Sequence, residues 1–315
     1  MRRVGQCQSS SRRTVSVTAA ADQKQVFITG GNTGIGFETA KELCNKGYAV
    51  TIAGRDSTKI TNAMDKIRAS IPGAQLSMLP LDLSDLVSVA DCAKRVLDSG
   101  VEYDVWINNA GVMATPPMKT KQGFEFQLGT NHLGHFLLTT TVLPALKAAN
   151  KPVRVINVAS SAHEFGKIDF NNLMREKFYT PWDAYGQSKL ANVMFSYEMQ
   201  RRVRADPNIT VHALHPGVVN TELGRYMVND SNKMFMGPAI WLASAFFKTP
   251  PQGAETSIFL ASTTEELEGG KYWSDCKRAT TSAASYDKDV AEKLWQRSAE
   301  LIDSVMPAAA SAAAM

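Results

Sequence analysis

The chain has 315 residues, of which 44% are hydrophobic and 20% are charged, a balance typical of a globular protein with a sizeable core. This length suits one large α/β domain or two small ones. Residues 1–21 carry four arginines and no acid, so removing them from the net charge of +4 leaves a neutral body, which argues against nucleic-acid binding through a basic surface.

The N-terminal leader, residues 1–21, is rich in Arg and Ser and lacks a continuous apolar run. This composition resembles an organelle transit peptide more than a secretory signal. Its last residues, VSVTAAA, are typical of a plastid-type processing region, so we expect an organellar location, in the chloroplast or another plastid. The mitochondrion, the cytoplasm and a merely disordered N-terminus are the alternatives. At the other end, residues 307–315 are Ala-rich, and we expect a disordered tail.

The four cysteines are scattered and form no CxxC motif, which indicates free thiols in a reducing compartment. No group of Cys and His residues has the spacing of a zinc site, so we expect no resident metal. No apolar stretch of the sequence reaches the ~18–20 residues that span a bilayer.

From Lys24 onward, β-rich stretches alternate with amphipathic helical ones. The predicted strands lie at residues 25–30, 48–54, 74–83, 103–111, 153–160, 210–217 and, as a final edge strand, 271–277. The predicted helices lie at residues 37–47, 57–73, 84–100, 123–149 and 183–204. Ser57 and Ser84 are the predicted N-caps of two of them. The alternation predicts an α/β fold, a Rossmann-type doubly wound parallel sheet in a single domain over residues 22–306.

A glycine-rich stretch, TGGNTGIG, follows the first predicted strand at residues 29–36. Glycines at this place allow a tight turn and let the backbone approach a pyrophosphate, which the N-terminus of the next helix then binds. The predicted cofactor contacts in this loop are Gly30, Asn32, Thr33, Gly34, Ile35 and Gly36.

The end of the second predicted strand indicates which dinucleotide binds. An NAD enzyme usually has an acidic residue here for the ribose hydroxyls, whereas this chain has Gly54 followed by Arg55. A guanidinium suits a 2′-phosphate, so we predict NADP(H); a solvated loop charge is the alternative. Asp82 and Leu83, at the end of the third strand, are placed to contact the adenine, although Asp82 could instead cap the following helix.

Three motifs in fixed order resemble those of short-chain dehydrogenases/reductases: TGxxxGxG, NNAG at residues 108–111, and YxxxK formed by Tyr185 and Lys189. The resemblance covers residues 24–303. Four further segments resemble the retinol-dehydrogenase-like and plastid import-associated reductases, and more distantly the light-dependent protochlorophyllide oxidoreductases: TKQGFEFQLGTNHLGHFLLT, AYGQSKLANVMF, HPGVVNTELGR and GGKYWSDCKRA.

The resemblance implies a catalytic set. Tyr185 would be the general acid/base, and Lys189 would lower the pKa of Tyr185 and hold the nicotinamide ribose. Ser160, rather than Ser161, would bind the substrate oxygen, and Asn131 would hold a water in a proton relay. The resemblance also implies that Asn109, Ala110 and Gly111 line the adenine-ribose side of the cofactor and that Pro216, Gly217, Val219 and Thr221 cover the nicotinamide.

Other reactive side chains have simpler interpretations. His132 and His135 form an H-x-x-H pair, but no carboxylate stands at a useful local spacing, which disfavours a metal. We expect a structural loop role for His163 and an inert thiol for Cys276.

A substrate lid is predicted over residues 222–250. Within it, residues 231–250 are rich in Met, Phe and Trp, which suits a lipophilic substrate or a peripheral membrane contact. A helix buried against its own domain or against a partner subunit is the alternative. The oligomeric state stays open.

The sequence therefore predicts an NADP(H)-dependent oxidoreductase that transfers hydride between the nicotinamide and a carbonyl or alcohol of a bulky, lipophilic, retinal-like substrate. Protochlorophyllide reduction is one alternative, but the chain departs from that group because HPGVVNT lacks the cysteine the group carries near this loop. The other alternative is an NADPH-binding sensor at a plastid translocon or membrane, which would bind NADPH without turnover.

Overall fold

The computed structural model describes residues 23–219 and 247–306. The predicted leader, the C-terminal tail, Thr221 and residues 222–246 of the predicted lid lie outside the described residues.

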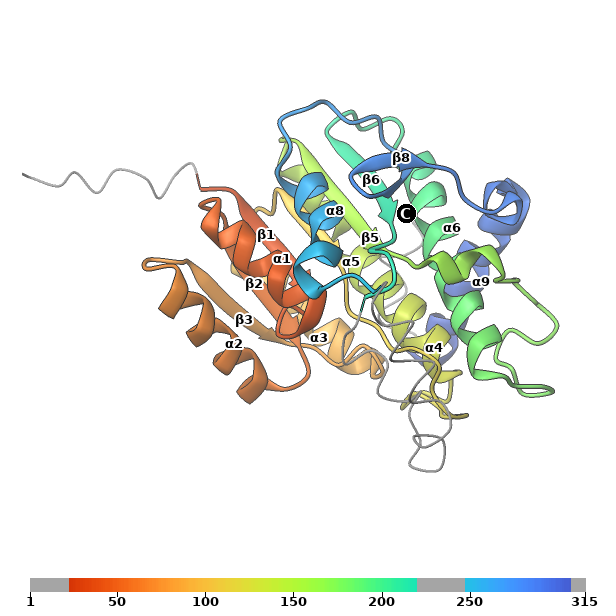
Figure 1. The fold of residues 1–315 in the computed structure, drawn as a ribbon. Helices are drawn as coiled ribbons and strands as arrows, with labels where there is room; N and C mark the ends of the chain where they lie inside the picture. Colours follow the sequence, from red (N-terminus) through yellow and green to blue (C-terminus); the bar gives the residue numbers. More distant parts are fainter. Residues whose placement is uncertain (1–22, 220–246, 307–315) are drawn as a thin grey trace, which may run out of the picture.

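An eight-stranded sheet organises the chain, with strand order β3-β2-β1-β4-β5-β6-β7-β8 (Figure 1). The strands are β1 Gln25–Thr29, β2 Ala49–Gly54, β3 Leu76–Pro80, β4 Val105–Asn108, β5 Val153–Val158, β6 Ile209–Leu214, β7 Lys271–Ser274 and β8 Lys277–Ala279. All neighbours pair in parallel except β7 and β8. The predicted α/β doubly wound fold is confirmed, and the strand order reverses between β1 and β4.

The edge of the sheet differs from the prediction. The stretch 271–277 was expected to be one edge strand, but β7 lies inside the sheet and β8 turns back on it in an antiparallel hairpin. The two turn residues, Asp275 and Cys276, both have positive φ, 51° and 58°. Such a two-residue turn usually contains Gly or Asn, and its absence here hid the hairpin in the sequence.

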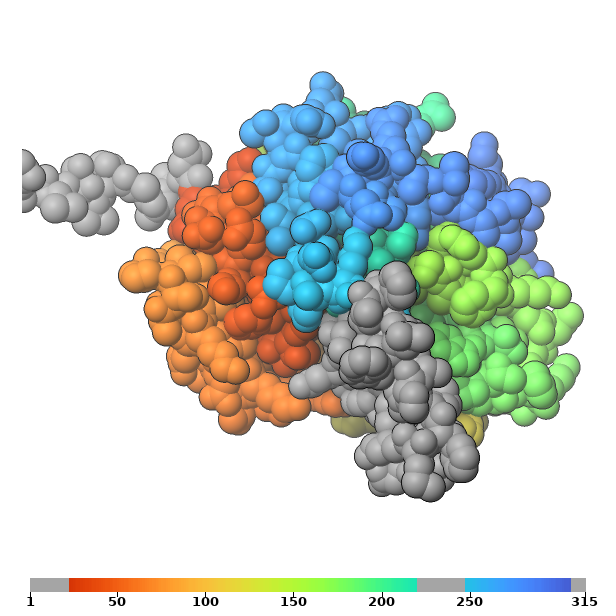
Figure 2. Space-filling model, viewed as in Figure 1, coloured from red at the N-terminus to blue at the C-terminus, as the bar shows by residue number. Residues whose placement is uncertain are grey.

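Helices cover both faces of the sheet. They are α1 Gly34–Asn45, α2 Ser57–Ser70, α3 Leu86–Ser99, α4 Phe126–Leu128, α5 Gly134–Ala148, α6 Pro181–Arg202, α8 Pro250–Ser262 and α9 Lys288–Val305. Helices α1, α2 and α8 pack on one face, and α3, α5 and α6 pack on the other with α9 against α6. In the space-filling view α1 and α8 form one continuous surface (Figure 2).

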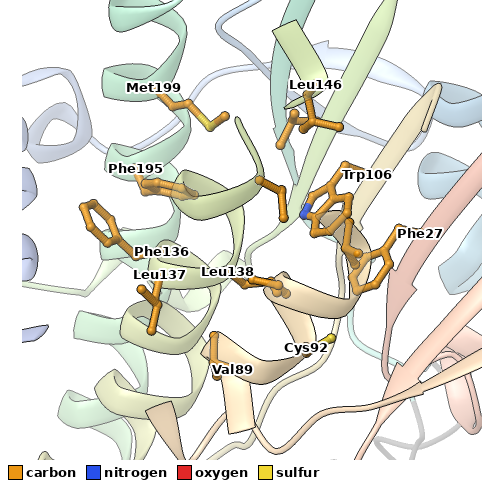
Figure 3. Close-up of a cluster of buried hydrophobic side chains, with 14 of the residues drawn as sticks. Phe27, Val89, Cys92, Trp106, Phe136, Leu137, Leu138, Leu146, Phe195 and Met199 are labelled. Carbon is orange, nitrogen blue, oxygen red and sulfur yellow. The ribbon is translucent and has the colours of Figure 1, made fainter. Parts of the chain in front are cut away.

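Alternation along β1 shows how the two cores arise. Val26 and Ile28 are buried against α1, α2 and α8, whereas Phe27 points to the opposite face. There the Phe27 ring stacks on the Trp106 indole with 3.9 Å between centroids, beside α3 and α5 (Figure 3). Burial on both faces fixes the strand register, because a one-residue slip would exchange the two sets of side chains.

The two predicted serine caps are wrong by one residue. Asp56 caps α2, accepting a hydrogen bond from the Lys59 backbone N–H at 3.0 Å. Asp85 caps α3, accepting from the Val87 N–H at 3.1 Å. In each case an aspartate is adjacent to the predicted serine, and the carboxylate is the stronger acceptor near the positive end of the helix dipole.

The predicted helix over 123–149 is interrupted. A π-helical turn, Gly129–Leu133, separates α4 from α5. At the start of α5, a Cβ placed on Gly134 would lie 2.6 Å from the Leu83 carbonyl oxygen. Helix α5 therefore approaches the loop after β3 at backbone distance, and only glycine permits it.

Gly134→Ala tests this close approach. Helix propensity alone predicts a gain of about 1 kcal/mol in unfolding free energy, whereas overpacking against Leu83 predicts a loss of about 1–3 kcal/mol. We expect the loss, measured by urea denaturation. Thr141→Ala in the same helix is the control, and it should change stability by less than about 0.5 kcal/mol. A stabilised Gly134→Ala would contradict the packing argument.

Candidate active site

A cavity of about 220 Å³ opens at the carboxyl ends of β1 to β4, beside the point where the strand order reverses. Ligands of doubly wound sheets bind in this crevice. Eight of the predicted cofactor contacts line it: Gly30, Asn32, Thr33, Arg55, Asp82, Leu83, Ala110 and Gly111. Sequence reasoning missed others, among them Lys59, Ser84, Val112, Phe126 and Thr130.

The glycine turn is built by close backbone packing. A Cβ on Gly36 would clash with the Gly30 carbonyl oxygen, and one on Gly30 would lie 3.0 Å from the Ala110 Cβ. Gly30 and Gly34 also have positive φ, 67° and 55°. The loop thus needs glycine at all three predicted positions, two for conformation and one for space.

Two cations stand on the wall beyond β2. Arg55 and Lys59 both line the cavity and are exposed, so they remain hydrated and accessible to a ligand. Lys59 lies in the first turn of α2, where sequence reasoning saw only a helix start. Asp56, on the same wall, has its carboxylate engaged in capping α2. The pair suits a dianionic group such as a 2′-phosphate.

Asp82 lies on the cavity wall and does not cap α3. Its Oδ1 accepts from the Ser84 N–H at 3.0 Å and from the Ser84 hydroxyl at 2.6 Å, a local turn that places both residues on the wall. The alternative reading of Asp82 as a helix cap is wrong, because Asp85 fills that role.

Tyr185 lies in the first turns of α6, whose start is fixed by the Thr180 hydroxyl accepting from the Asp183 N–H. Tyr185 is 3% exposed, and the Ser160 side chain lies close enough to its phenol to affect its pKa. Burial raises the pKa of Tyr185 to about 12, and the interaction with the Ser160 side chain offsets only part of that rise. The structure thus brings Tyr185 and Ser160 together, and their catalytic roles stay predictions.

Lys189 lies one turn after Tyr185, with its Nζ 5.8 Å from the centre of the Tyr185 ring. Burial lowers the pKa of Lys189 to about 8, and its ammonium donates to the Val158 carbonyl at 3.1 Å. Desolvation of the phenolate dominates and raises the net pKa of Tyr185, so a lowering contribution from Lys189 stays a prediction.

Asn131 lies in the π-helical turn and is fully buried. Its Oδ1 accepts from the Val112 N–H at 2.8 Å, and its Nδ2 donates to the Val112 carbonyl and to the Ser188 hydroxyl, each at 2.9 Å. A Cβ on Gly111 would lie 3.1 Å from Asn131 Oδ1 and 3.5 Å from Lys189 Nζ. Asn131 and Lys189 therefore both lie close to Gly111, and the Lys189 Nζ also lies near the Tyr185 ring.

The other predicted cofactor contacts within the described residues do not line the cavity. Asn109 ties strand ends together, donating from Nδ2 to the Thr29 carbonyl at 2.8 Å. Val219 and Ile35 meet at α8, since a Cβ on Gly253 would lie 2.6 Å from the Val219 side chain and 3.2 Å from that of Ile35. In the turn after β6, Pro216 precedes Gly217, which has a φ of 84°.

The three histidines singled out in the sequence have separate partners. His132 bonds Ser298 at 2.8 Å, whereas His135 bonds Thr29 at 2.9 Å. Burial lowers the pKa of His132 to about 3 and that of His135 to about 4. Among residues 23–219 and 247–306, no three His, Cys, Asp or Glu side chains are grouped as a metal site requires.

His163 supports the turn that carries Ser160. Its Nδ1 lies 2.7 Å from the Ser160 carbonyl oxygen, and its Nε2 accepts from the Ser282 N–H at 3.3 Å. The expected structural role is confirmed. Burial raises the pKa of the Cys276 thiol, as an inert cysteine requires.

Buried amides join the strand ends beneath the site, a feature that sequence reasoning missed. Asn108 donates to Thr139 at 2.8 Å and to Asn157 at 2.7 Å, and Asn157 donates to Ser196 at 2.9 Å. Asparagine near a strand end is common, so the signal was the placement of Asn108 and Asn157 at equivalent positions of two neighbouring strands.

In the part of the chain that the structure describes, no helix has the length and apolar character to cross a membrane.

Comparison with known proteins agrees with this architecture. Residues 24–232 match the family model described as short chain dehydrogenase. Retinol dehydrogenase 12 of Mus musculus is 45% identical over 282 residues, covering 89% of this chain and 86% of that protein. Retinol dehydrogenase 11 of Homo sapiens is 44% identical over 281 residues with the same coverage.

A solved structure of an uncharacterized protein from Mycobacterium paratuberculosis is 35% identical, with a TM-score of 0.69 over 89% of this chain and 93% of that one. The L-sorbose reductase of Gluconobacter frateurii is 20% identical with a TM-score of 0.65 over 80% of this chain and 94% of that one, a likeness of fold. The chain therefore belongs to the short-chain dehydrogenase family and is an oxidoreductase of CH–OH and C=O groups whose sequence is similar to that of retinol dehydrogenases.

Proposed function

We propose that the protein is an NADP(H)-dependent reductase of a bulky, lipophilic, retinal-like carbonyl compound. The observation that carries this proposal is the placement of Asn131 and Lys189 close to Gly111, on the wall of a cavity that Arg55 and Lys59 also line. The retinol dehydrogenases to which the chain is similar support the choice of substrate class.

The residues present fit a dinucleotide. The hydroxyl of Thr130 is buried without a hydrogen-bond partner within the described part of the chain, and Thr130 lies on the cavity wall. A buried, unpaired hydroxyl costs free energy unless a ligand pairs with it. Gly111 leaves open the space in front of Asn131 and Lys189 that a side chain would fill. Arg55 and Lys59 would hold the 2′-phosphate.

In the proposed mechanism, NADPH when bound supplies the hydride that is added to the carbonyl carbon. Ser160 donates a hydrogen bond to the carbonyl oxygen and orients it toward Tyr185. Because the pKa of Tyr185 is about 12, the phenol is protonated at neutral pH and is ready to deliver its proton to that oxygen. Lys189, with a pKa of about 8, is mostly charged at pH 7 and stabilises the phenolate left behind.

The surroundings of Tyr185 favour an apolar substrate. The Trp182 indole packs at 76° to the Tyr185 ring with 6.1 Å between centroids, and it is 44% exposed. Phe165 lies against Gly186 on the same helix and is also exposed. Two exposed aromatic rings beside the proton donor suit a hydrocarbon chain attached to the carbonyl.

The leader carries a separate proposal, because its composition resembles a transit peptide. We expect protein isolated from its source organelle to lack approximately the first 21 residues, as read by N-terminal sequencing. An intact N-terminus in the isolated protein would contradict an organellar address.

Tyr185→Phe tests the proton donor. We expect kcat for a lipophilic aldehyde to fall by about 10²–10⁴-fold while NADPH affinity stays within about twofold, because the phenol acts only on the substrate oxygen. Turnover is followed by NADPH consumption and affinity by cofactor fluorescence. Tyr197→Phe, on the same helix but bonded to Thr281, is the matched control and should keep its activity. Near-normal turnover by Tyr185→Phe would remove this residue from the acid role.

Arg55→Ala and Lys59→Ala test the cofactor choice. Each should weaken NADPH binding by about 10–100-fold and leave NADH binding nearly unchanged, because a charge-assisted bond to the 2′-phosphate is lost. Lys66→Ala, an exposed lysine farther along α2, is the control and should bind NADPH as the parent does. Equal affinity of the parent protein for NADPH and NADH would overturn the assignment.

A further inference from the structure

A buried histidine, His135, connects two parts of the site that the proposed chemistry uses separately. Its side chain spans from Thr29, the last residue of β1, to the backbone of Asn131 in the π-helical turn. His135 is 2% exposed. His135 is the second histidine of the H-x-x-H pair, and the proposed mechanism gives it no role.

The hydrogen bonds around Thr29 determine where the imidazole proton lies. The Thr29 hydroxyl oxygen accepts from the backbone N–H groups of Asn109 and Ala110, each at 2.9 Å. Two acceptances use both lone pairs of a hydroxyl, so its own hydrogen must point to the third partner, His135 Nε2, at 2.9 Å. Nε2 is therefore the acceptor and carries no proton.

The other imidazole nitrogen must then carry the proton. His135 Nδ1 lies 3.0 Å from the Asn131 carbonyl oxygen, which can only accept, so the neutral Nδ1–H tautomer satisfies both ends of the ring. The charged form would lose the bond from Thr29 and would sit near the buried Lys189 ammonium. That charge and burial both lower the pKa of His135, to about 4.

The result is a continuous chain of bonds through the site. It runs from the Asn109–Ala110 backbone, which forms the cavity wall at Ala110, through Thr29 and His135 to Asn131. From Asn131 it continues to the Ser188 hydroxyl on α6, between Tyr185 and Lys189. The links join the loop after β4 to β1, β1 to His135 at the start of α5, His135 to the π turn, and the π turn to α6.

We propose that His135 is a positioning residue of the reductase site: as a neutral Nδ1–H imidazole it holds the turn of Asn131 in register with the nucleotide-binding end of β1. This inference rests on the proposed function for its kinetic consequence, but not for the bonds or the tautomer. A π turn is an irregular helical segment and needs such support from its surroundings. A displacement of even 1 Å between catalytic groups costs up to about 10²-fold in rate.

His132 provides a matched control three residues away. It is equally buried, but its Nε2 donates to the Ser298 hydroxyl, which in turn donates to the Leu294 carbonyl in α9. This bond ties the π turn to α9, and neither of its two residues lines the cavity. A histidine that acts only through packing should behave like His132, whereas a positioning histidine should not.

Two conservative variants separate the two bonds of His135. His135→Gln places an amide where Nε2 lies, so it keeps an acceptor for Thr29 and loses the bond to Asn131. His135→Asn places an amide where Nδ1 lies, so it keeps the donor to Asn131 and loses the acceptor for Thr29. We expect His135→Gln to lower kcat by about 10–100-fold with NADPH affinity within about twofold. His135→Asn should weaken NADPH binding several-fold and keep kcat at saturating cofactor.

His132→Gln should leave kcat, KM and NADPH affinity unchanged even where it lowers the melting temperature. Equal loss of kcat in His135→Gln, His135→Asn and His132→Gln would overturn the proposal, because only lost packing would then be measured. Parent-like kinetics in His135→Gln would also overturn it.

The tautomer is tested on the parent protein by long-range ¹H–¹⁵N NMR correlations of the imidazoles, with NADPH alone as the added probe. We expect the His135 signal of a neutral Nδ1–H ring from pH 6 to pH 8 (roughly two or more pH units above its lowered pKa). A protonated Nε2 would overturn the inference. This NMR measurement uses no substrate, so it does not depend on turnover. If the parent protein reduced no carbonyl compound, the proposed function would be refuted while the assignment of the tautomer would stand.

Discussion

The contact between the ends of β1 and β4 is the constraint on which the site depends. The Thr29 hydroxyl takes two backbone N–H groups from the β4 end, and the Asn109 amide returns a bond to the Thr29 carbonyl. The strand order reverses at this point, so the segments that follow β1 and β4 run to opposite faces of the sheet. Gly36 then packs against the Gly30 carbonyl, closing the turn onto the same contact. Hydrogen bonds between the strand ends therefore hold the cavity open and fix the position of the backbone that lines it.

Burial sets the chemistry of the polar groups around this contact. Tyr185 and Lys189 are both buried, and desolvation favours the neutral form of each side chain. It raises the pKa of the phenol to about 12 and lowers the pKa of the ammonium to about 8. A neutral phenol is a proton donor, so this environment suits the reductive direction of the proposed reaction. The oxidative direction would begin with a phenolate, which needs a nearby positive charge to offset its desolvation.

Motifs that need a particular residue for local reasons were predictable from the sequence. The sheet, the glycine turn and the Tyr185–Lys189 spacing follow from periodicity, glycine geometry and one helical turn. Features that depend on tertiary contacts were not. Three such features are the π turn, the β7–β8 hairpin and the contribution of Lys59 to the cavity. They arise where distant elements meet, and the neighbouring residues give no pattern that predicts them. The misassigned caps show a finer limit, because two adjacent residues were both suitable and the chain used the carboxylate.

The histidines show how tertiary context decides between identical local patterns. In the sequence His132 and His135 are equivalent members of one H-x-x-H pair. A shift of three residues along a helix turns them in nearly the same direction, yet His132 meets Ser298 of α9 and His135 meets Thr29 of β1. The first contact holds the outer helix, and the second joins the nucleotide turn to Asn131. A metal-binding interpretation would pair His135 with His132, but the state of His135 is set by Thr29. Both lone pairs of the Thr29 hydroxyl accept backbone hydrogen bonds, so the hydroxyl donates to His135 Nε2 and the imidazole proton lies on Nδ1.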